Sequence, residues 1–329
     1  MQRLVTFNKV GYDPFIDFIK AYAIICVLIG HTFPKLDLVG YGLWAGMQVP
    51  LFILVQAFHV FKKENSHLSI KKIFFRIFLP FFIVEAGIFA ILLWIYRHDI
   101  NSLTWKYLTG GGTGPGSYYP WIYLQIAIAL PFFGRWMRNK SKTFLLITYL
   151  IICEGLEIAF SVANFPDFLY RLLAVRYIFL FYLAWIWVKE GIVINKWTCS
   201  LSFLSLLAII YFEYFSINDE PLFFHTAWAY HRWPCYYYVA IFWGYFLFIL
   251  HRWISQKTYL KRIVNVLAKC SYEIFLVQMA MCAVIPSFKF IPINSLNVLL
   301  RIIIIFAISI VGGYLFHQYY NSAINRYIK

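Results

Sequence analysis

Apolar windows of about 20 residues recur along the chain and are separated by short charged or Gly/Pro-rich gaps. Hydrophobic residues make up 62% and charged residues 13% of the 329-residue chain, whereas soluble domains hold roughly 45–50% apolar and 25% charged residues. The sequence therefore predicts an all-α polytopic membrane protein with about ten transmembrane helices, with most of the chain in membrane lipid. We expect these helices near residues 14–34, 39–61, 73–97, 117–137, 143–163, 169–189, 197–215, 231–252, 264–286 and 294–317.

The Lys and Arg residues fall mainly in alternate gaps, which predicts an orientation. With the N-terminus inside, about 19 of the 29 basic residues lie on the cytoplasmic side and about six lie outside. We therefore expect both termini in the cytoplasm. Polar stretches stay below about 25 residues, so we expect a single transmembrane domain over residues 1–329 without an appended soluble domain. The net charge of +15 reflects this topology and does not indicate a nucleic-acid partner.

The first window carries three ionisable residues on one helical face. At about 100° per residue, Lys20 and His31 differ by about 20° around the helix, and Asp17 and His31 by about 40°. Lys20 and His31 lie roughly 16 Å apart along the axis, about half of the bilayer core. Asp17 and Lys20, spaced i, i+3, are expected to neutralise each other. The pair is either an interfacial anchor or part of a site in which His31 acts as a base.

Other polar residues have two interpretations each. Glu85 and Arg176 lie well inside their windows, so they either pair with other buried charges or touch a cavity. Trp121 belongs to an aromatic cluster that either forms an interfacial belt or stacks on sugar rings. The glycines at 110–116 are not followed by the Lys and Ser/Thr of a phosphate loop, so we expect a flexible turn there. The six cysteines lack metal-ligand spacing, and we expect no metal and no bound cofactor.

The first span resembles the signature of the acyltransferase 3 family. In that family Asp, two residues, Arg, ten residues and His follow one another, and here Asp17, Lys20 and His31 occupy these positions, with Lys in place of the usual Arg. Four further segments are similar to family motifs in order and content: 49–54, 71–81, 120–124 and 270–278. The resemblance as a whole covers roughly residues 12 to 317. The last segment includes Tyr272 and ends at Gln278, where the family often has His.

The resemblance implies a bacterial multi-pass protein of the cytoplasmic membrane that acylates a hydroxyl of a cell-surface or lipid-linked glycan. The donor would be cytoplasmic acyl-CoA, most simply acetyl-CoA, and Lys72 and Arg76 would bind its phosphates. Alternatively, Lys72 and Arg76 bind no ligand and only follow the positive-inside bias. His31 would be a general base or a transient acyl carrier. Lys20 would contact the donor, and Asp17 would neutralise the charge of Lys20. Tyr272, Gln278 and Trp121, with Glu85 and Arg176, are further candidates for the cavity.

A transporter that exports a glycan or its lipid-linked precursor is the alternative function. It would also use many spans, aromatic belts and charged cavity residues. The two functions differ at His31, because acyl transfer needs a base aligned with a cytoplasmic cation and transport does not.

Overall fold

A computed structural model describes residues 3–7, 13–32, 40–63, 69–95, 97–215, 224–225, 231–284 and 295–328. The α-helices are α1 (Pro14–Thr32), α2 (Tyr41–Trp44), α3 (Gln48–Lys62), α4 (Ile70–Ile73), α5 (Leu79–Ala90), α6 (Ile100–Gly110), α7 (Tyr119–Met137), α8 (Lys142–Val162), α9 (Asp167–Tyr170), α10 (Ile178–Glu190), α11 (Lys196–Tyr214), α12 (Gly244–Ile254), α13 (Thr258–Lys269), α14 (Ser271–Val284) and α15 (Ser295–Ile328). The remaining elements are the π-helices η1 (Phe74–Phe78), η2 (Ile91–Ile95) and η6 (Tyr238–Trp243), the 3₁₀ helices η3 (Ala174–Tyr177) and η5 (Trp233–Cys235), and the strands β1 (Arg3–Val5) and β2 (Ile192–Ile194).

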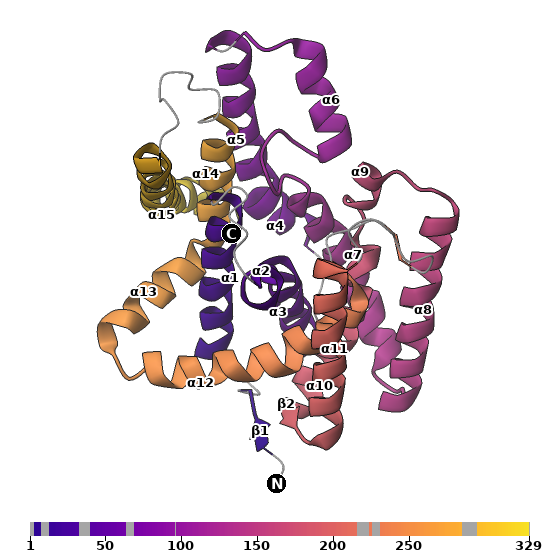
Figure 1. The fold of residues 1–329 in the computed structure, drawn as a ribbon. Helices are drawn as coiled ribbons and strands as arrows, with labels where there is room; N and C mark the ends of the chain where they lie inside the picture. Colours follow the sequence, from indigo (N-terminus) through magenta and orange to yellow (C-terminus); the bar gives the residue numbers. More distant parts are fainter. Residues whose placement is uncertain are drawn as a thin grey trace.

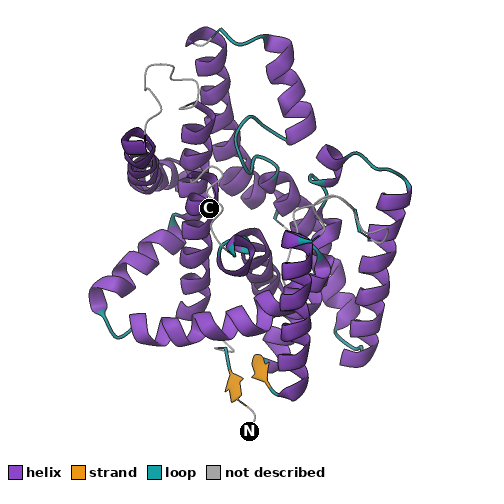
Figure 2. Ribbon diagram, viewed as in Figure 1, coloured by secondary structure: helices purple, strands orange, loops and turns teal. Residues whose placement is uncertain are grey.

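The all-α architecture predicted from the sequence is confirmed (Figure 2). Among the described residues, seven helical stretches are long and apolar enough to cross a membrane: Pro14–Thr32, Tyr41–Lys62, Ile70–Ile95, Lys142–Val162, Lys196–Tyr214, Trp233–Ile254 and Ile302–Ile324. The pair α13 and α14, bent by 68°, makes an eighth if it is one span. The described residues thus support a multi-pass protein with seven or eight candidate spans, and the expected count of ten stays a prediction. The cytoplasmic location of the termini stays a prediction. The ends of some expected windows, such as 33–34 and 285–286, lie outside the described residues.

Two of the expected windows differ from these spans. Window 117–137 does form the single helix α7, although it is not among the seven. Window 169–189 is not one helix, because it is divided into α9, η3 and α10. The side chain of Gln125 on α7 compensates the break: its Oε1 accepts from Ala174 N at 3.0 Å and its Nε2 donates to Leu172 O at 2.6 Å. A side-chain amide therefore satisfies backbone groups that a continuous helix would pair internally.

Several helices begin at polar residues in the gaps between apolar windows. Asp99 and Ser141 accept hydrogen bonds from the backbone N–H groups three residues ahead, at the starts of α6 and α8. Asn195 and Thr198 form a reciprocal capping box at the start of α11. Such caps satisfy N–H groups that have no partner within the helix.

Helices α1 and α3 pack together in the middle of the molecule (Figure 1). Helices α8 to α11 lie on the right in this view, α13 to α15 on the left, α12 along the bottom, and α5 and α6 at the top. Two hydrophobic cores flank the centre: one joins the first half of α1 to α3, α7, α8 and α10, and the other joins its second half to α5 and α14. Phe52 and Tyr119 pack against both cores. The segments around the centre therefore come from opposite ends of the sequence.

Near the N-terminus, β1 pairs antiparallel with β2, with Val5 opposite Ile192. Gly191 precedes β2 with φ +76°, and a Cβ atom there would lie 2.0 Å from the carbonyl oxygen of Val5. We predict that Gly191→Ala lowers the unfolding free energy of the detergent-solubilised protein by more than about 1 kcal/mol, because alanine is strained at positive φ and collides with the paired strand.

The matched control is Gly155→Ala in α8, where a Cβ meets nothing within 4 Å. Thermal unfolding of both variants measures the effect. Equal melting temperatures for the two variants would contradict the assigned strand pairing.

Candidate functional site

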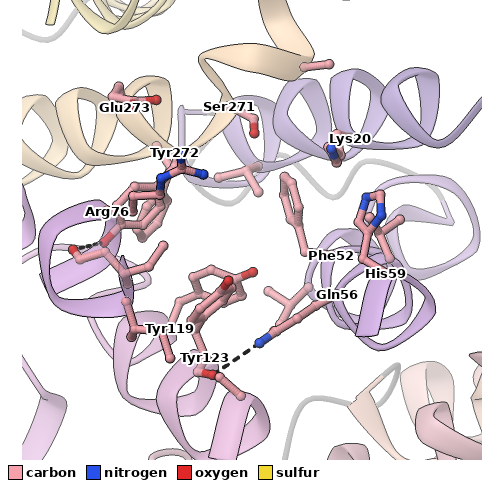
Figure 3. A pocket seen from close by; sticks show the side chains of 18 of the residues that line it. Lys20, Phe52, Gln56, His59, Arg76, Tyr119, Tyr123, Ser271, Tyr272 and Glu273 are labelled. Atoms are coloured by element: carbon pink, nitrogen blue, oxygen red, sulfur yellow. Dashed lines mark hydrogen bonds between the residues drawn. The ribbon is translucent and has the colours of Figure 1, made fainter. Parts of the chain in front are cut away.

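A cavity of about 870 Å³ lies between α1, α3, α7, α14 and α15. Residues from the stretch 69–77, from the loop before α7 and from the end of α13 complete its lining. Figure 3 shows Lys20 and His59 on one side of the hollow, Arg76 and Tyr272 on the opposite side, and Tyr119 and Tyr123 across from Ser271. The cavity thus gathers polar side chains that are as much as 300 residues apart in the sequence, from Lys20 to Asn321.

The lining residues fall into three layers, as their positions along the helices show. On α1, Val27 lies about two turns from Lys20 and one turn from His31. On α3, Phe52 lies about one turn from Gln48 on one side and from Gln56 on the other. We call the three layers the basic end (Lys20, Gln56, His59, Lys72, Arg76, Lys269), the middle layer (Val27, Phe52, Tyr119, Phe275) and the His31 end (His31, Gln48, Gly116, Tyr118).

The basic end carries an excess of positive charge. Lys20 Nζ lies 3.0 Å from Asp17 Oδ1, so the neutralising pair expected from the i, i+3 spacing is confirmed. Glu273 also lines the cavity, and its Oε1 atom lies 3.0 Å from Nδ1 of His317. Lys72, Arg76 and Lys269 are exposed and contribute their charge to the cavity. The arrangement is suited to an anionic ligand.

The π-helix η1 fixes the backbone on both sides of Arg76. A π-helix replaces the normal i to i−4 pattern and is frequent at functional sites. Here Tyr272 Oη on α14 donates to the carbonyl of Ile77 at 2.7 Å, and Tyr320 Oη on α15 donates to the carbonyl of Phe75. Two helices from the C-terminal part of the chain therefore hold the turn that carries Arg76.

At the other end, a glutamine orients His31. The Nδ1 atom of His31 lies 3.2 Å from Gln278 Oε1, and Gln278 Nε2 donates to Cys282 Sγ at 3.6 Å. Because the amide oxygen faces the ring, the hydrogen of a neutral imidazole belongs on Nδ1 and the lone pair on Nε2. Gln278 is fully buried and does not itself line the cavity. His31 thus has the tautomer that a general base or a nucleophile requires.

The glycine-rich segment before α7 forms a wall beside His31. A Cβ atom on Gly116, which has φ +84°, would lie 2.7 Å from Phe275 Cε2 and 3.4 Å from His31 Cε1. The carboxylate of Glu85, which is 1% exposed, accepts hydrogen bonds from the hydroxyl of Thr113 at 2.8 Å and from the backbone N–H of Thr113. Trp121 Nε1 donates to Gly111 O at 2.9 Å. Glu85 and Trp121 therefore bond to this segment, which forms the expected turn.

The structure brings part of the predicted site together. The residues that line the cavity are Lys20, His31, Lys72, Arg76 and Tyr272. Asp17 and Gln278 contact the lining residues Lys20 and His31 from behind. Glu85 and Trp121 instead bond to Thr113 and Gly111, which precede the lining residue Gly116 in the glycine-rich segment. Arg176 does not line the cavity: it is 3% exposed, and its guanidinium carbon lies 5.7 Å from the ring centroid of Tyr118, which does. Arg176 is thus separated from the cavity by one aromatic ring.

His59, His317 and the two glutamines of α3 are cavity residues that sequence reasoning missed. A signal for them exists, because each interrupts an otherwise apolar window with a polar or titratable side chain. In the part of the chain that the structure describes, no group of three or more His, Cys, Asp or Glu side chains could hold a metal ion.

We predict that Thr113→Val destabilises the protein by about 1–3 kcal/mol, because it removes a hydrogen bond to a buried carboxyl group. Thermal unfolding measures the change. Thr109→Val is the control, since the Thr109 hydroxyl bonds only to the Trp105 carbonyl one turn back in its own helix. A melting temperature that falls no further for Thr113→Val than for Thr109→Val would contradict the anchoring role of Glu85.

The comparisons with known proteins agree with the resemblance seen in the sequence. A family model described as an acyltransferase domain, Acyl_transf_3, matches residues 13–318. No curated protein and no solved structure matches the chain. The matched region includes all of the cavity lining up to His317 and leaves out only Tyr320 and Asn321. Because the match covers nearly the whole chain, this multi-pass membrane protein is an acyltransferase that belongs to the acyltransferase 3 family.

Proposed function

We propose that the protein transfers an acyl group, most simply acetyl, from acyl-CoA to a hydroxyl of a cell-surface or lipid-linked glycan. The observation that carries this proposal is the single cavity that joins the basic end to His31. Coenzyme A is polyanionic at one end and carries its thioester at the other. The cavity has the same polarity, with cations at one end and a potential base at the other.

The basic end is the proposed site for the phosphates of coenzyme A. Lys20 and Arg76 face the hollow from opposite sides (Figure 3), and Lys72 and Lys269 also line it. Arg and Lys are the common ligands of phosphate groups in proteins. The pair with Asp17 keeps the Lys20 side chain positioned while part of its charge is balanced.

On either side of the middle layer, the cavity has features that suit a pantetheine arm. Gln48 Oε1 and Gln56 Oε1 are buried, and within the described residues neither has a hydrogen-bond partner. A buried acceptor without a partner costs about 1–3 kcal/mol, and the two amide N–H groups of pantetheine are donors of the right kind. Lys20 and His31 lie roughly 16 Å apart along α1, a distance comparable to the extended arm.

His31 is the proposed base. Its Nε2 takes the proton of the acceptor hydroxyl, the resulting oxygen attacks the thioester carbonyl, and the C–S bond breaks to release coenzyme A, whose thiolate recovers the proton from His31. An acyl group carried transiently on Nε2 is the variant of this chemistry that trapping experiments would reveal. With the expected orientation, the donor enters from the cytoplasm and the acceptor hydroxyl is on the opposite side of the bacterial cytoplasmic membrane.

The test uses proteoliposomes with labelled acetyl-CoA on one side and, on the other, lipid-linked glycans extracted from cells that lack this protein. We predict that His31→Ala lowers transfer of label to glycan by about 10²–10⁴-fold, the usual contribution of a general base. His98→Ala, an exposed histidine before α6, is the matched control. Transfer that survives in His31→Ala would refute the assigned site, and glycan movement that does not depend on acyl-CoA would favour a transporter.

The role of Arg76 is tested through the Michaelis constant. We predict that Arg76→Ala raises the KM for acetyl-CoA by about tenfold or more while kcat changes less, because a charge-assisted contact to phosphate contributes about 1.5–3 kcal/mol. Arg135→Ala, at the exposed end of α7, controls for the loss of a basic residue. An unchanged KM in Arg76→Ala would remove this residue from the donor site.

A further inference from the structure

Helix α13 is amphipathic, and only its last two residues, Ala268 and Lys269, line the cavity. At about 100° per residue, its apolar side chains span an arc of about 200° and its polar ones fall in the opposite arc of about 100°. One side of the helix is thus suited to an apolar environment and the other to water. The apolar arc holds Tyr259, Leu260, Ile263, Val264, Val266, Leu267 and Ala268, and the polar arc includes Thr258, Lys261, Arg262, Asn265 and Lys269.

The apolar arc has two halves with different surroundings. One half faces the protein, because α13 packs against α1, and Val264 and Leu267 pack against the two hydrophobic cores. The other half, which we call the apolar edge, consists of Tyr259, Ile263 and Val266, which are 64%, 52% and 39% exposed. Adjacent apolar side chains are unfavourable in water. The apolar edge is therefore suited to an apolar phase outside the protein.

The cations of this region have no acidic counterpart nearby in the sequence. Lys257, Lys261 and Arg262 are exposed, and no Asp or Glu occurs between Glu220 and Glu273. Within the described residues, none of these three cations takes part in an ion pair. Unpaired cations are costly in the hydrocarbon core of a bilayer. The charges of α13 thus favour a place at the membrane surface over a place in a span.

The position of α13 in the fold also fits a membrane surface. His251, at the end of α12, contacts the rings of Phe15 and Phe18 at the start of α1, so the connection from α12 to α13 lies beside the end of that span. From there α13 runs obliquely toward α14 (Figure 1), and the two helices are bent by 68°. If α14 follows the bilayer normal, α13 lies much closer to the membrane plane than to the normal. Trp253, 58% exposed at the end of α12, adds an aromatic side chain of the kind that lies at membrane interfaces.

We propose that α13 is an interfacial helix that binds anionic phospholipids. Its apolar edge lies among the acyl chains, and Lys257, Lys261 and Arg262 contact the phosphates of the headgroups. A basic amphipathic helix binds a membrane through its buried apolar area and through attraction to anionic lipid. A zwitterionic phospholipid offers the same acyl chains without the net negative charge, so it satisfies only the apolar edge. With the expected orientation, the bound lipid is in the cytoplasmic leaflet.

The first experiment compares melting temperatures of the 329-residue protein in mixed micelles with phosphatidylglycerol or with phosphatidylcholine. A ligand that binds only the folded state raises the melting temperature, so we expect phosphatidylglycerol to raise it by a few degrees more. High salt should remove this difference, because salt screens exposed charges. A triple variant should also lose it: Lys257→Gln, Lys261→Gln and Arg262→Gln. The matched control, which should keep it, changes three exposed cations outside α12 and α13: Arg135→Gln, Lys140→Gln and Lys189→Gln.

The second experiment locates the apolar edge with a fluorophore on Ile263→Cys, in a Cys199→Ser background because Cys199 is an exposed cysteine. In vesicles that contain phosphatidylglycerol, lipids with a nitroxide on the acyl chain should quench this label more than aqueous iodide does. The reverse is expected for the control label on Thr258→Cys, which lies in the polar arc and is exposed.

Equal melting temperatures in the two lipids, or an equal loss in both triple variants, would overturn the site for anionic lipid. The salt dependence of the unmodified protein decides this question if the first triple variant does not fold. A label at Ile263→Cys that iodide quenches more strongly would overturn the interfacial placement. Neither measurement requires acyl transfer, so a failure of this inference is distinct from a failure of the proposed function.

Discussion

Lipid offers no hydrogen bonds, so each polar side chain of a spanning helix must find its partner within the protein or face a cavity. Helix α1 carries two such polar side chains, Lys20 and His31, on one face, and each has a partner within the protein. Lys20 is balanced one turn away by Asp17, and His31 is bonded to Gln278 across the helix interface. Most of the site depends on these two arrangements, because together they place a cation and an oriented imidazole on the same wall of one cavity.

The cavity exists because several helices around α1 depart from regular geometry. The π-helix at Phe74–Phe78 exposes carbonyls that Tyr272 and Tyr320 then satisfy, and this turns Arg76 toward the hollow. The bend of 68° between α13 and α14 brings Lys269 and Ser271 to the same place. At the π-helix, side chains from α14 and α15 satisfy the backbone carbonyls, whereas at the bend the N–H groups of Cys270 and Ile274 bond to backbone carbonyls four residues earlier. Tyr272 of α14 thus lines the cavity and also holds the backbone beside Arg76.

The alternation of polar, apolar and polar layers bears on the proposed transfer of an acyl group across the membrane. A continuous polar path from the basic end to His31 would also conduct water and small ions. The middle layer interrupts that path with three aromatic rings and a valine, while Gln48 and Gln56 remain on either side of it as acceptors. An amide-bearing chain can occupy such a layer more favourably than water can, because its apolar carbons and its N–H groups both find partners.

The sequence alone determined the all-α membrane class, the shared face of Asp17, Lys20 and His31 and the family to which the chain belongs. These properties follow from hydrophobic periodicity and from short motifs, which are local. The division of window 169–189, the anchoring role of Glu85 and Trp121 and the entry of His59 into the cavity required the tertiary structure. So did the bond between His31 and Gln278, which are 247 residues apart. Whether a polar residue lines a cavity, holds a loop or faces another ring depends on the rotation of each helix about its axis. That rotation is set by packing between distant helices, and no local pattern records it.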